Sequence, residues 1–140
     1  MRIYLSASYK RQQDLRPYRD RLVAAGHVVT SSWIDEDTAT GQRWQAPEAA
    51  ALRRRIGFKD MAEILASDLI ISDHTVPSTS GGTHSELGIA LAAAMLRFYE
   101  MKIWTVGDPQ PPRSPFFELA DRHFDTWDHI MEELIRGQDL

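Results

Sequence analysis

The sequence predicts an α/β fold, with a five-stranded parallel sheet sandwiched by helices in a flavodoxin-like or Rossmann-like three-layer arrangement. The first observation is that short apolar or β-branched runs alternate with segments of helical spacing along the chain. This alternation is typical of parallel strands joined by crossover helices. The second is that 140 residues, 43% of them hydrophobic, suit one domain with a real core, which we expect over residues 1–140.

The first strand is expected at residues 3–7, where apolar residues run without a break. A polar loop follows at 8–13. Apolar residues at helical spacing then predict a helix over 15–25, which Gly26 ends well. The β-branched segment 27–33 predicts the second strand.

The middle of the chain begins with a polar segment, 34–45, which we expect to be a loop that closes over the ligand. Pro47 then opens a helix expected over 48–66, because proline is favoured in the first turn of a helix. A buried third strand is expected at 69–72. The helix after it, 83–98, is apolar on nearly every side and should be well buried.

The fourth strand is expected at 102–106, where Ile, Trp, Thr and Val follow one another. Segment 107–115 carries four prolines and should be a loop. A short strand near 123–126 and a last helix over 127–135 complete the alternation.

Composition and charge exclude several classes of function. The formal net charge of −4 gives no basic stripe for polymeric nucleic acid, and the run Arg53–Arg55 is expected on the solvated face of a helix. The chain has no cysteine, so disulfides and thiolate chemistry are excluded. No apolar segment is long enough to span a membrane, and the N-terminus enters a strand directly, so a cytoplasmic protein is expected.

Glu86 is the most informative residue. Its motif, Ser80-Gly81-Gly82-Thr83-His84-Ser85-Glu86-Leu87-Gly88, links the third strand to the next helix and should place a carboxylate in that helix's first turn. The helix dipole favours negative charge there, so Glu86 should stay ionised and could attack a sugar carbon. An alternative is a capping box, with Thr83 as N-cap and Glu86 reaching back to it.

Loops at the carboxyl edge of a parallel sheet bind ligands. We expect three there, after Ala7, Ser72 and Val106. The first carries Ser8, Lys10 and Arg11, and the second carries Ser80, Gly81 and Gly82, all of which could donate to a phosphate. Solvent exposure is an equally good interpretation of the two basic residues. Neither dinucleotide-binding nor P-loop motifs are present.

Asp60 and Tyr4 each allow two interpretations. Asp60 lies near the C-terminal end of its expected helix, where a carboxylate is electrostatically unfavourable. That position hints at a function, although surface aspartates are common. The Tyr4 hydroxyl could orient a carboxylate, or Tyr4 could simply belong to the core.

The chain resembles the nucleoside 2-deoxyribosyltransferase superfamily, including its nucleotide N-hydrolase branch. The resemblance rests on Ile3-Tyr4-Leu5, the segment from Asp60 to Asp73, and Gly82 to Gly88. It implies that Glu86 is a nucleophile that attacks the anomeric carbon, that Asp60 assists at the base or sugar, and that Tyr4 holds Glu86. With Gly82 and His84 of the motif, Ser8, Lys10, Arg11 and Ser80 are the expected substrate-binding residues.

The resemblance also implies a homodimer or larger homo-oligomer acting on a small nucleoside or nucleotide. No metal or organic cofactor is expected, because a proton assists the leaving group and the carboxylate stabilises positive charge on the sugar. Ser80, six residues before Glu86, favours a 5′-monophosphate hydrolase. Transferases of free nucleosides tend to carry aspartate there. A deoxyribosyltransferase and a non-catalytic nucleotide-binding module are the alternatives, and the preferred base and sugar are open.

Overall fold

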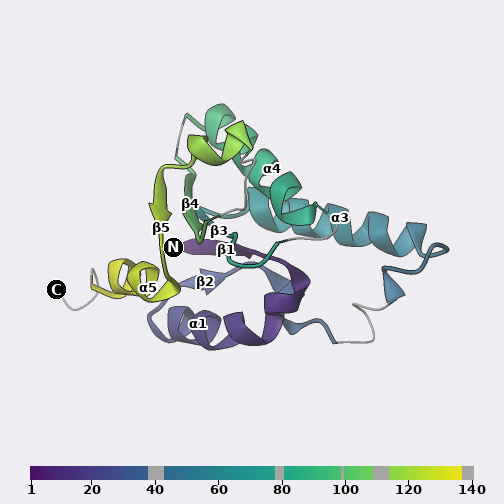
Figure 1. The fold of residues 1–140 in the computed structure, drawn as a ribbon, viewed down its shortest axis with the longest axis horizontal. Helices are drawn as coiled ribbons and strands as arrows, with labels where there is room; N and C mark the ends of the chain where they lie inside the picture. Colours follow the sequence, from purple (N-terminus) through teal and green to yellow (C-terminus); the bar gives the residue numbers. More distant parts are fainter. Residues whose placement is uncertain (38–42, 78–80, 99, 109–113, 137–140) are drawn as a thin grey trace.

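The structure is a computed structural model that describes residues 1–37, 43–77, 81–98, 100–108 and 114–136. Its centre is a parallel sheet with the strand order β2-β1-β3-β4-β5 (Figure 1). The strands are β1 Arg2–Ser6, β2 Val28–Val29, β3 Leu69–Asp73, β4 Lys102–Val106 and β5 Arg122–Phe124. The predicted five-stranded parallel sheet is therefore confirmed, and its order is the flavodoxin-like one.

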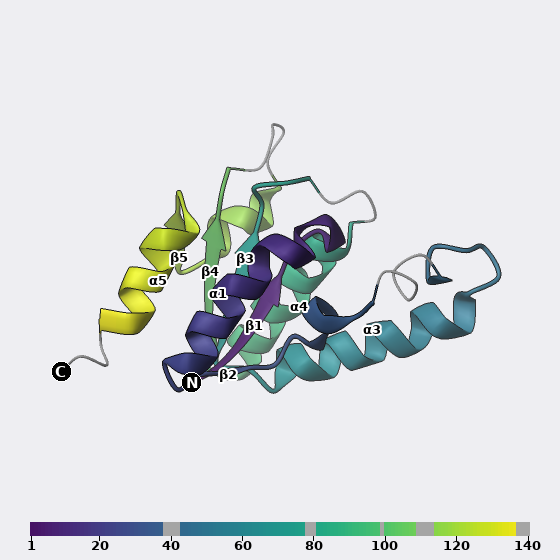
Figure 2. The ribbon, with the colours of Figure 1, turned by 90° about the horizontal axis from the view of Figure 1, so that it is seen from below.

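Four helices cover the two faces of the sheet. The helices α1 (Gln12–Ala24) and α5 (Trp127–Arg136) lie on one face, and α3 (Ala50–Leu65) and α4 (Gly82–Leu96) lie on the other (Figures 1 and 2). Three short 3₁₀ helices complete the described elements: η1 Tyr9–Arg11, η2 Ser32–Asp35 and η3 Pro115–Leu119. The three-layer arrangement is the one that the alternation of strands and helices predicts.

The core lies between the sheet and both helix layers. The apolar side chains of β1 and β3 are fully or almost fully buried, as expected for central strands of a parallel sheet. Leu15 and Leu22 of α1 fill one side, and Leu87 and Ala90 of α4 fill the other. No helix within the described residues is long and apolar enough to cross a membrane.

Several elements differ from the sequence prediction. The polar segment after β1 contains η1 and the start of α1, and α3 begins only at Ala50, so Pro47 lies in a turn before that helix and does not open it. The second strand is only Val28–Val29, because the chain turns into η2 at Ser32 and the Trp33 indole donates to the Leu5 carbonyl at 2.7 Å. Helix α4 is not well buried on all sides. Its Met95 and Leu96 are 66% and 81% exposed, because α4 packs on the sheet and on α3 with one side only.

The topology creates a crevice at the carboxyl end of β1. From β1 the chain continues through α1 to β2, which pairs with one edge of β1. It then returns through α3 to β3, which pairs with the other edge of β1. In doubly wound sheets ligands bind where the strand order reverses in this way. A ligand site is therefore expected among the residues that follow β1 and β3 along the chain, together with α3.

Candidate active site

Glu86 lies in α4, and its position in the helix differs by about half a turn from the sequence prediction. Gly81 adopts a left-handed conformation with φ of 74°, which turns the chain from the β3 loop into a helix that begins at Gly82. Glu86 is therefore the fifth helical residue, beyond the first turn. No side chain caps this helix, so the capping-box interpretation of Thr83 and Glu86 is wrong. The Glu86 carboxylate is left available for another role.

A pocket of about 340 Å³ opens in front of Glu86. Its wall is formed by residues that follow β1, by the start of α4, by η2 and the segment after it, and by α3. The lining residues are Ala7, Ser8, Tyr9, Trp33, Glu36, Trp44, Arg53, Ile56, Gly57, Asp60, Gly82, Thr83 and Glu86. The pocket thus combines three carboxyl groups, Glu36, Asp60 and Glu86, with three aromatic rings, Tyr9, Trp33 and Trp44. We call the part at Glu86 the inner end and the part at Glu36, Trp33 and Trp44 the outer end.

Unpaired polar atoms gather around this pocket. Within the described residues, five buried side-chain atoms make no hydrogen bond of good geometry, although Asp60 Oδ1 has the Lys59 ammonium at 3.2 Å: Tyr4 Oη, Ser6 Oγ, Asp60 Oδ1, Thr83 Oγ1 and Glu86 Oε2. Three of them belong to residues that line the pocket. Buried polar groups in folded proteins are nearly always paired, so a cluster of unpaired ones requires an explanation. A polar ligand in the pocket provides one.

The Glu86 carboxyl is easier to protonate than the sequence suggested. Burial raises its pKa from the ordinary 4.5 to about 7, and the negative charge of Asp60 adds to this rise. The Tyr4 and Ser6 hydroxyls are close enough to lower the pKa, although they do not offset burial. The expectation that a helix N-terminus keeps Glu86 fully ionised is therefore wrong, because Glu86 lies beyond the first turn and burial dominates.

Asp60 faces the same pocket from α3. Burial raises its pKa to about 6, against the lowering effect of the Lys59 ammonium. Lys59 Nζ lies 3.2 Å from Asp60 Oδ1 as an ion pair, without hydrogen-bond alignment. Asp60 and Glu86 thus form a pair of interacting carboxyls that both titrate near neutral pH. Such a pair can hold one proton while its other member stays charged.

Tyr4 belongs to the core and also lies beside Glu86, and its role in orienting that carboxylate stays a prediction. The residue is fully buried in the core, and its hydroxyl lies close to the Glu86 carboxyl. Ser6, which the sequence analysis missed, faces the same carboxyl from the end of β1. Residues two apart in a strand point to the same side, so Tyr4 in this role would have indicated Ser6 as well.

Two expected phosphate contacts line the pocket. Ser8 is 6% exposed and follows β1, and Gly82 is the first residue of α4. The first backbone N–H groups of a helix have no partner within it, so Gly82 begins a segment that can donate to an anion. Ser80, the third expected contact, lies outside the described residues.

Lys10, Arg11 and His84 lie elsewhere. Lys10 is exposed, and the Arg11 guanidinium is paired with Asp14 at 2.8 Å and with buried Asp73 at 3.3 Å. His84 is exposed on α4, 5.5 Å from the His74 ring, and it lines a different groove from Glu86. None of the three lines the Glu86 pocket. Their contact with a substrate stays a prediction.

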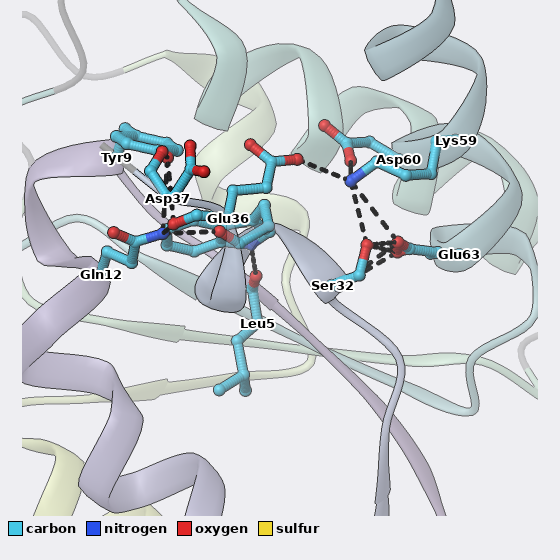
Figure 3. A network of polar contacts seen from close by, with 10 residues as sticks. Leu5, Tyr9, Gln12, Ser32, Glu36, Asp37, Lys59, Asp60 and Glu63 are labelled. Carbon is cyan, nitrogen blue, oxygen red and sulfur yellow. Dashed lines mark hydrogen bonds and ion pairs between the residues drawn. The ribbon is translucent and has the colours of Figure 1, made fainter. Parts of the chain in front are cut away.

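Most residues of the outer end of the pocket were not predicted from the sequence. Trp33, Trp44 and Ile56 were not singled out from the sequence, and neither was Glu36. The sequence predicted only that the polar segment 34–45 is a loop that closes over the base; Glu36 and Trp44 of this segment do line the pocket, residues 38–42 lie outside the described part of the chain, and the contact with a base stays a prediction. Lys59 connects Glu36 and Ser32 with α3, at 2.9 Å to each (Figure 3). This contact brings the loop after β2 against Asp60, which spacing along the chain could not reveal.

Comparison with known proteins finds solved structures with a similar fold. No family model and no curated protein matches the sequence. A 2-deoxyribosyltransferase from Bacillus psychrosaccharolyticus has a similar structure with a TM-score of 0.66 and 14% identity, over 94% of this chain and 90% of that one. A CMP N-glycosidase from Clostridium botulinum gives a TM-score of 0.59 and 18% identity, over 96% and 98% of the two chains.

A conserved protein from Enterococcus faecalis V583 is also similar, with a TM-score of 0.63 and 15% identity over 98% of each chain. The two neighbours with named activities are both enzymes, one a deoxyribosyltransferase and the other an N-glycosidase. The chain therefore has the fold of the superfamily that the sequence resembles, along nearly its whole length.

Proposed function

We propose that the protein is an N-glycosidase that releases the base from a nucleoside 5′-monophosphate, with Glu86 as a covalent nucleophile. The observation that carries the proposal is the cluster of buried atoms without a well-aligned hydrogen bond, from Asp60, Thr83 and Glu86 on the pocket wall and from Tyr4 and Ser6 beside Glu86. A nucleotide supplies groups of the kind these atoms lack. The named activities of the two similar structures, transfer of deoxyribose and cleavage of CMP, involve the same bond.

The first chemical step uses both carboxyl groups. Glu86, ionised, attacks the anomeric carbon as the bond from that carbon to the base nitrogen breaks. The electron pair of that bond goes to the base, which takes a proton from Asp60. The products are the free base, a glycosyl ester of Glu86 and an ionised Asp60.

The second step restores the enzyme. Asp60 accepts a proton from water as the water oxygen attacks the anomeric carbon, and the ester bond to Glu86 breaks. Two displacements at one carbon retain the configuration of the sugar. Tyr4 and Ser6 stabilise the charged form of Glu86 at the start and the end of the cycle, since both hydroxyls lower its pKa.

In the reactive form of the enzyme, the two carboxyls of Asp60 and Glu86 share one proton, and Asp60 holds it. In the free protein Glu86 has the higher pKa of the two, about 7 against about 6 for Asp60. The reactive arrangement is therefore a minor tautomer of the singly protonated pair, separated from the major one by about 1–2 kcal/mol. Positive charge that develops on the sugar favours the ionised Glu86 and so this tautomer.

A 5′-monophosphate is preferred to a nucleoside in this proposal because Ser8 and the start of α4 lie on the pocket wall. Backbone N–H groups and a serine hydroxyl donate to a phosphate dianion, and Ser80 would add a third donor. An aspartate in place of Ser80 would repel the phosphate. A deoxyribosyltransferase is the second candidate, supported by the similar structure of the bacterial transferase.

Liquid chromatography of reaction mixtures separates the candidates. Nucleosides and their 5′-monophosphates are incubated with the protein, each with and without a second free base. Release of base and sugar phosphate from monophosphates supports the hydrolase, and exchange of bases between nucleosides supports the transferase. Glu86→Gln is the control for contaminating activity. Binding without release or exchange would leave the non-catalytic module.

We also propose a homodimer or larger homo-oligomer, as the resemblance implies. Support comes from an uncharged face of α4 on which Gly88 and Ala92 are exposed beside Met95. Phe116 and Leu119 of η3 are 60% and 62% exposed at the same groove. Light scattering after size exclusion measures the mass, and Met95→Glu should lower it to that of one chain. A wild-type protein of one-chain mass would contradict this proposal.

A further inference from the structure

The outer end of the pocket is where a nucleobase fits. Lys59 Nζ lies 2.9 Å from Glu36 Oε1 and 3.2 Å from Asp60 Oδ1, so these two carboxyls are close to each other on the pocket wall. Asp60 is in turn near enough to Glu86 to raise its pKa. With the sugar at Glu86, the next group outward is the base. The neighbours of Glu36 there include Tyr9 and Trp33, whose rings lie 6.1 Å apart.

Several hydrogen-bond donors of the outer wall are already used within the protein. The Trp33 indole donates to the Leu5 carbonyl at 2.7 Å, and the Tyr9 hydroxyl donates to the Asp37 carbonyl at 3.0 Å. The Arg53 guanidinium is also occupied, because it donates to the carbonyls of Trp44, Ala46 and Pro47. These three groups hold the wall in shape; the single N–H of Trp33 and the O–H of Tyr9 are used up, and three of the five N–H groups of Arg53 are used.

Glu36 is held in place from two sides. Its backbone carbonyl accepts a hydrogen bond of 2.6 Å from the Gln12 amide, and its Oε1 accepts one of 2.9 Å from Lys59 Nζ. Lys59 approaches from a neighbouring groove and does not line the pocket. Figure 3 shows the second Glu36 oxygen turned away from Lys59. The side chain is only 16% exposed, so a fixed acceptor faces the pocket.

We propose that Glu36 reads the base, and that its carboxylate selects bases with an exocyclic amino group over their oxo counterparts. The inference rests on the proposed function. A carboxylate only accepts hydrogen bonds, so it pairs with the amino group of cytosine or adenine. The carbonyl of uracil or hypoxanthine at the same place would set two acceptors against each other. A buried polar group left unpaired in this way rejects the wrong ligand strongly.

The test compares two matched pairs of substrates, CMP with UMP and AMP with IMP, and their deoxy forms; the members of a pair differ at this group and in the hydrogen on the adjacent ring nitrogen. Base release should be faster in kcat/KM for the amino member of at least one pair, by roughly tenfold to a hundredfold for one charge-assisted hydrogen bond. Glu36→Gln should bring the two members of that pair to within about threefold, because an amide both donates and accepts.

Asp35→Asn is the matched control. Asp35 is adjacent in sequence, 66% exposed and paired with Arg19, and it does not line the pocket, so its substitution should leave the ratio unchanged. Equal kcat/KM for amino and oxo members in both pairs would overturn the inference while the proposed function stands. An equal loss on all substrates in Glu36→Gln would also overturn it, since Glu36 would then serve the sugar or the wall.

Base selection by Glu36 can also be tested by binding alone, without catalysis. If no nucleotide or nucleoside is cleaved, the proposed function is lost, and titration calorimetry with CMP and UMP then tests Glu36 alone. Tighter binding of CMP to the wild type, with the difference removed in Glu36→Gln, supports base reading. Equal binding of the two nucleotides overturns it.

Discussion

The Tyr4 hydroxyl lies beside the carboxyl of Glu86, which lines the pocket, and each carries a buried oxygen that has no hydrogen-bond partner of good geometry. They come from the first strand and from the helix after the third strand, so the fold brings them together across 82 positions of the chain. Tyr4 favours the charged form of Glu86, and burial opposes it.

Tyr4→Phe should fold normally and lose activity moderately. Phenylalanine fills the same space in the core, so only the contact of the hydroxyl with Glu86 is removed. One such contact contributes about 0.5–1.5 kcal/mol, so kcat/KM should fall roughly twofold to tenfold. The optimum should also move to higher pH, because the pKa of Glu86 rises without the hydroxyl. An unchanged rate and pH profile would separate Tyr4 from the reaction.

The rate of base release should depend on pH as a bell. The reaction needs one proton on the pair of Asp60 and Glu86, whose pKa values are raised to about 6 and about 7. Below the lower value both carboxyls are protonated and the nucleophile is lost. Above the higher value both are ionised and the acid is lost. Measurement of kcat/KM from about pH 4 to about pH 9 tests this, since the range extends roughly two pH units beyond each of the two pKa values.

Asp60→Asn distinguishes the two limbs. An amide cannot give a proton to the departing base, so cleavage should slow by roughly a hundredfold or more while substrate still binds. The limb of the bell at high pH should become shallow, since no acid remains to lose. Lys59 is the internal reference, because Lys59→Arg keeps the positive charge beside Asp60 and should keep the bell. Wild-type rates in Asp60→Asn would exclude Asp60 from the chemistry.

Glu86→Gln should make the folded protein more stable at high pH. The pKa of Glu86 is about 7 in the fold against an ordinary 4.5, so the folded state holds a proton that the unfolded state has lost. Glu86 therefore costs nothing below pH of about 4.5, and its cost grows up to pH of about 7, to at most about 3 kcal/mol. Urea unfolding of Glu86→Gln should show a small gain in the free energy of unfolding at pH 5 and a much larger gain at pH 8.

The exposed residue Glu48 provides the control for this experiment, because Glu48→Gln should change the free energy of unfolding little at either pH. A Glu86→Gln protein that is less stable than the wild type at pH 8 would show that Glu86 holds the fold together. In that case the unpaired Oε2 would need another explanation than a site kept ready for a ligand.

Much of the fold was predictable from local sequence. The strand Lys102–Val106 has the predicted bounds, since a β-branched run between turn residues leaves little choice. The start of α4 could not be predicted in this way. Gly81 in its left-handed conformation lets the helix begin at Gly82, before Thr83, so that no capping box forms. The shortness of β2 depends on the Trp33 indole bonding to β1, which is a tertiary contact.

The site divides in the same way. The motif indicated Glu86, and the pocket also contains the predicted residues Asp60, Ser8 and Gly82. The roles of Ser6, Glu36 and Lys59 depend on contacts between elements far apart in the chain. The level of the Glu86 pKa was misjudged for the same reason, because burial is a property of the packed structure and outweighs the dipole of one helix.

The central claim is a covalent bond between Glu86 and the sugar. The measurement is the mass of the protein after brief reaction with a 5′-monophosphate and rapid acid quenching, followed by mapping of peptides. A 2-fluoro sugar slows the second step by destabilising positive charge at the anomeric carbon, so the ester should accumulate. The account predicts the added mass of one sugar phosphate on the peptide that contains Glu86, and none in Glu86→Gln. Base release at the wild-type rate by folded Glu86→Gln, with no added mass on that peptide, would contradict it.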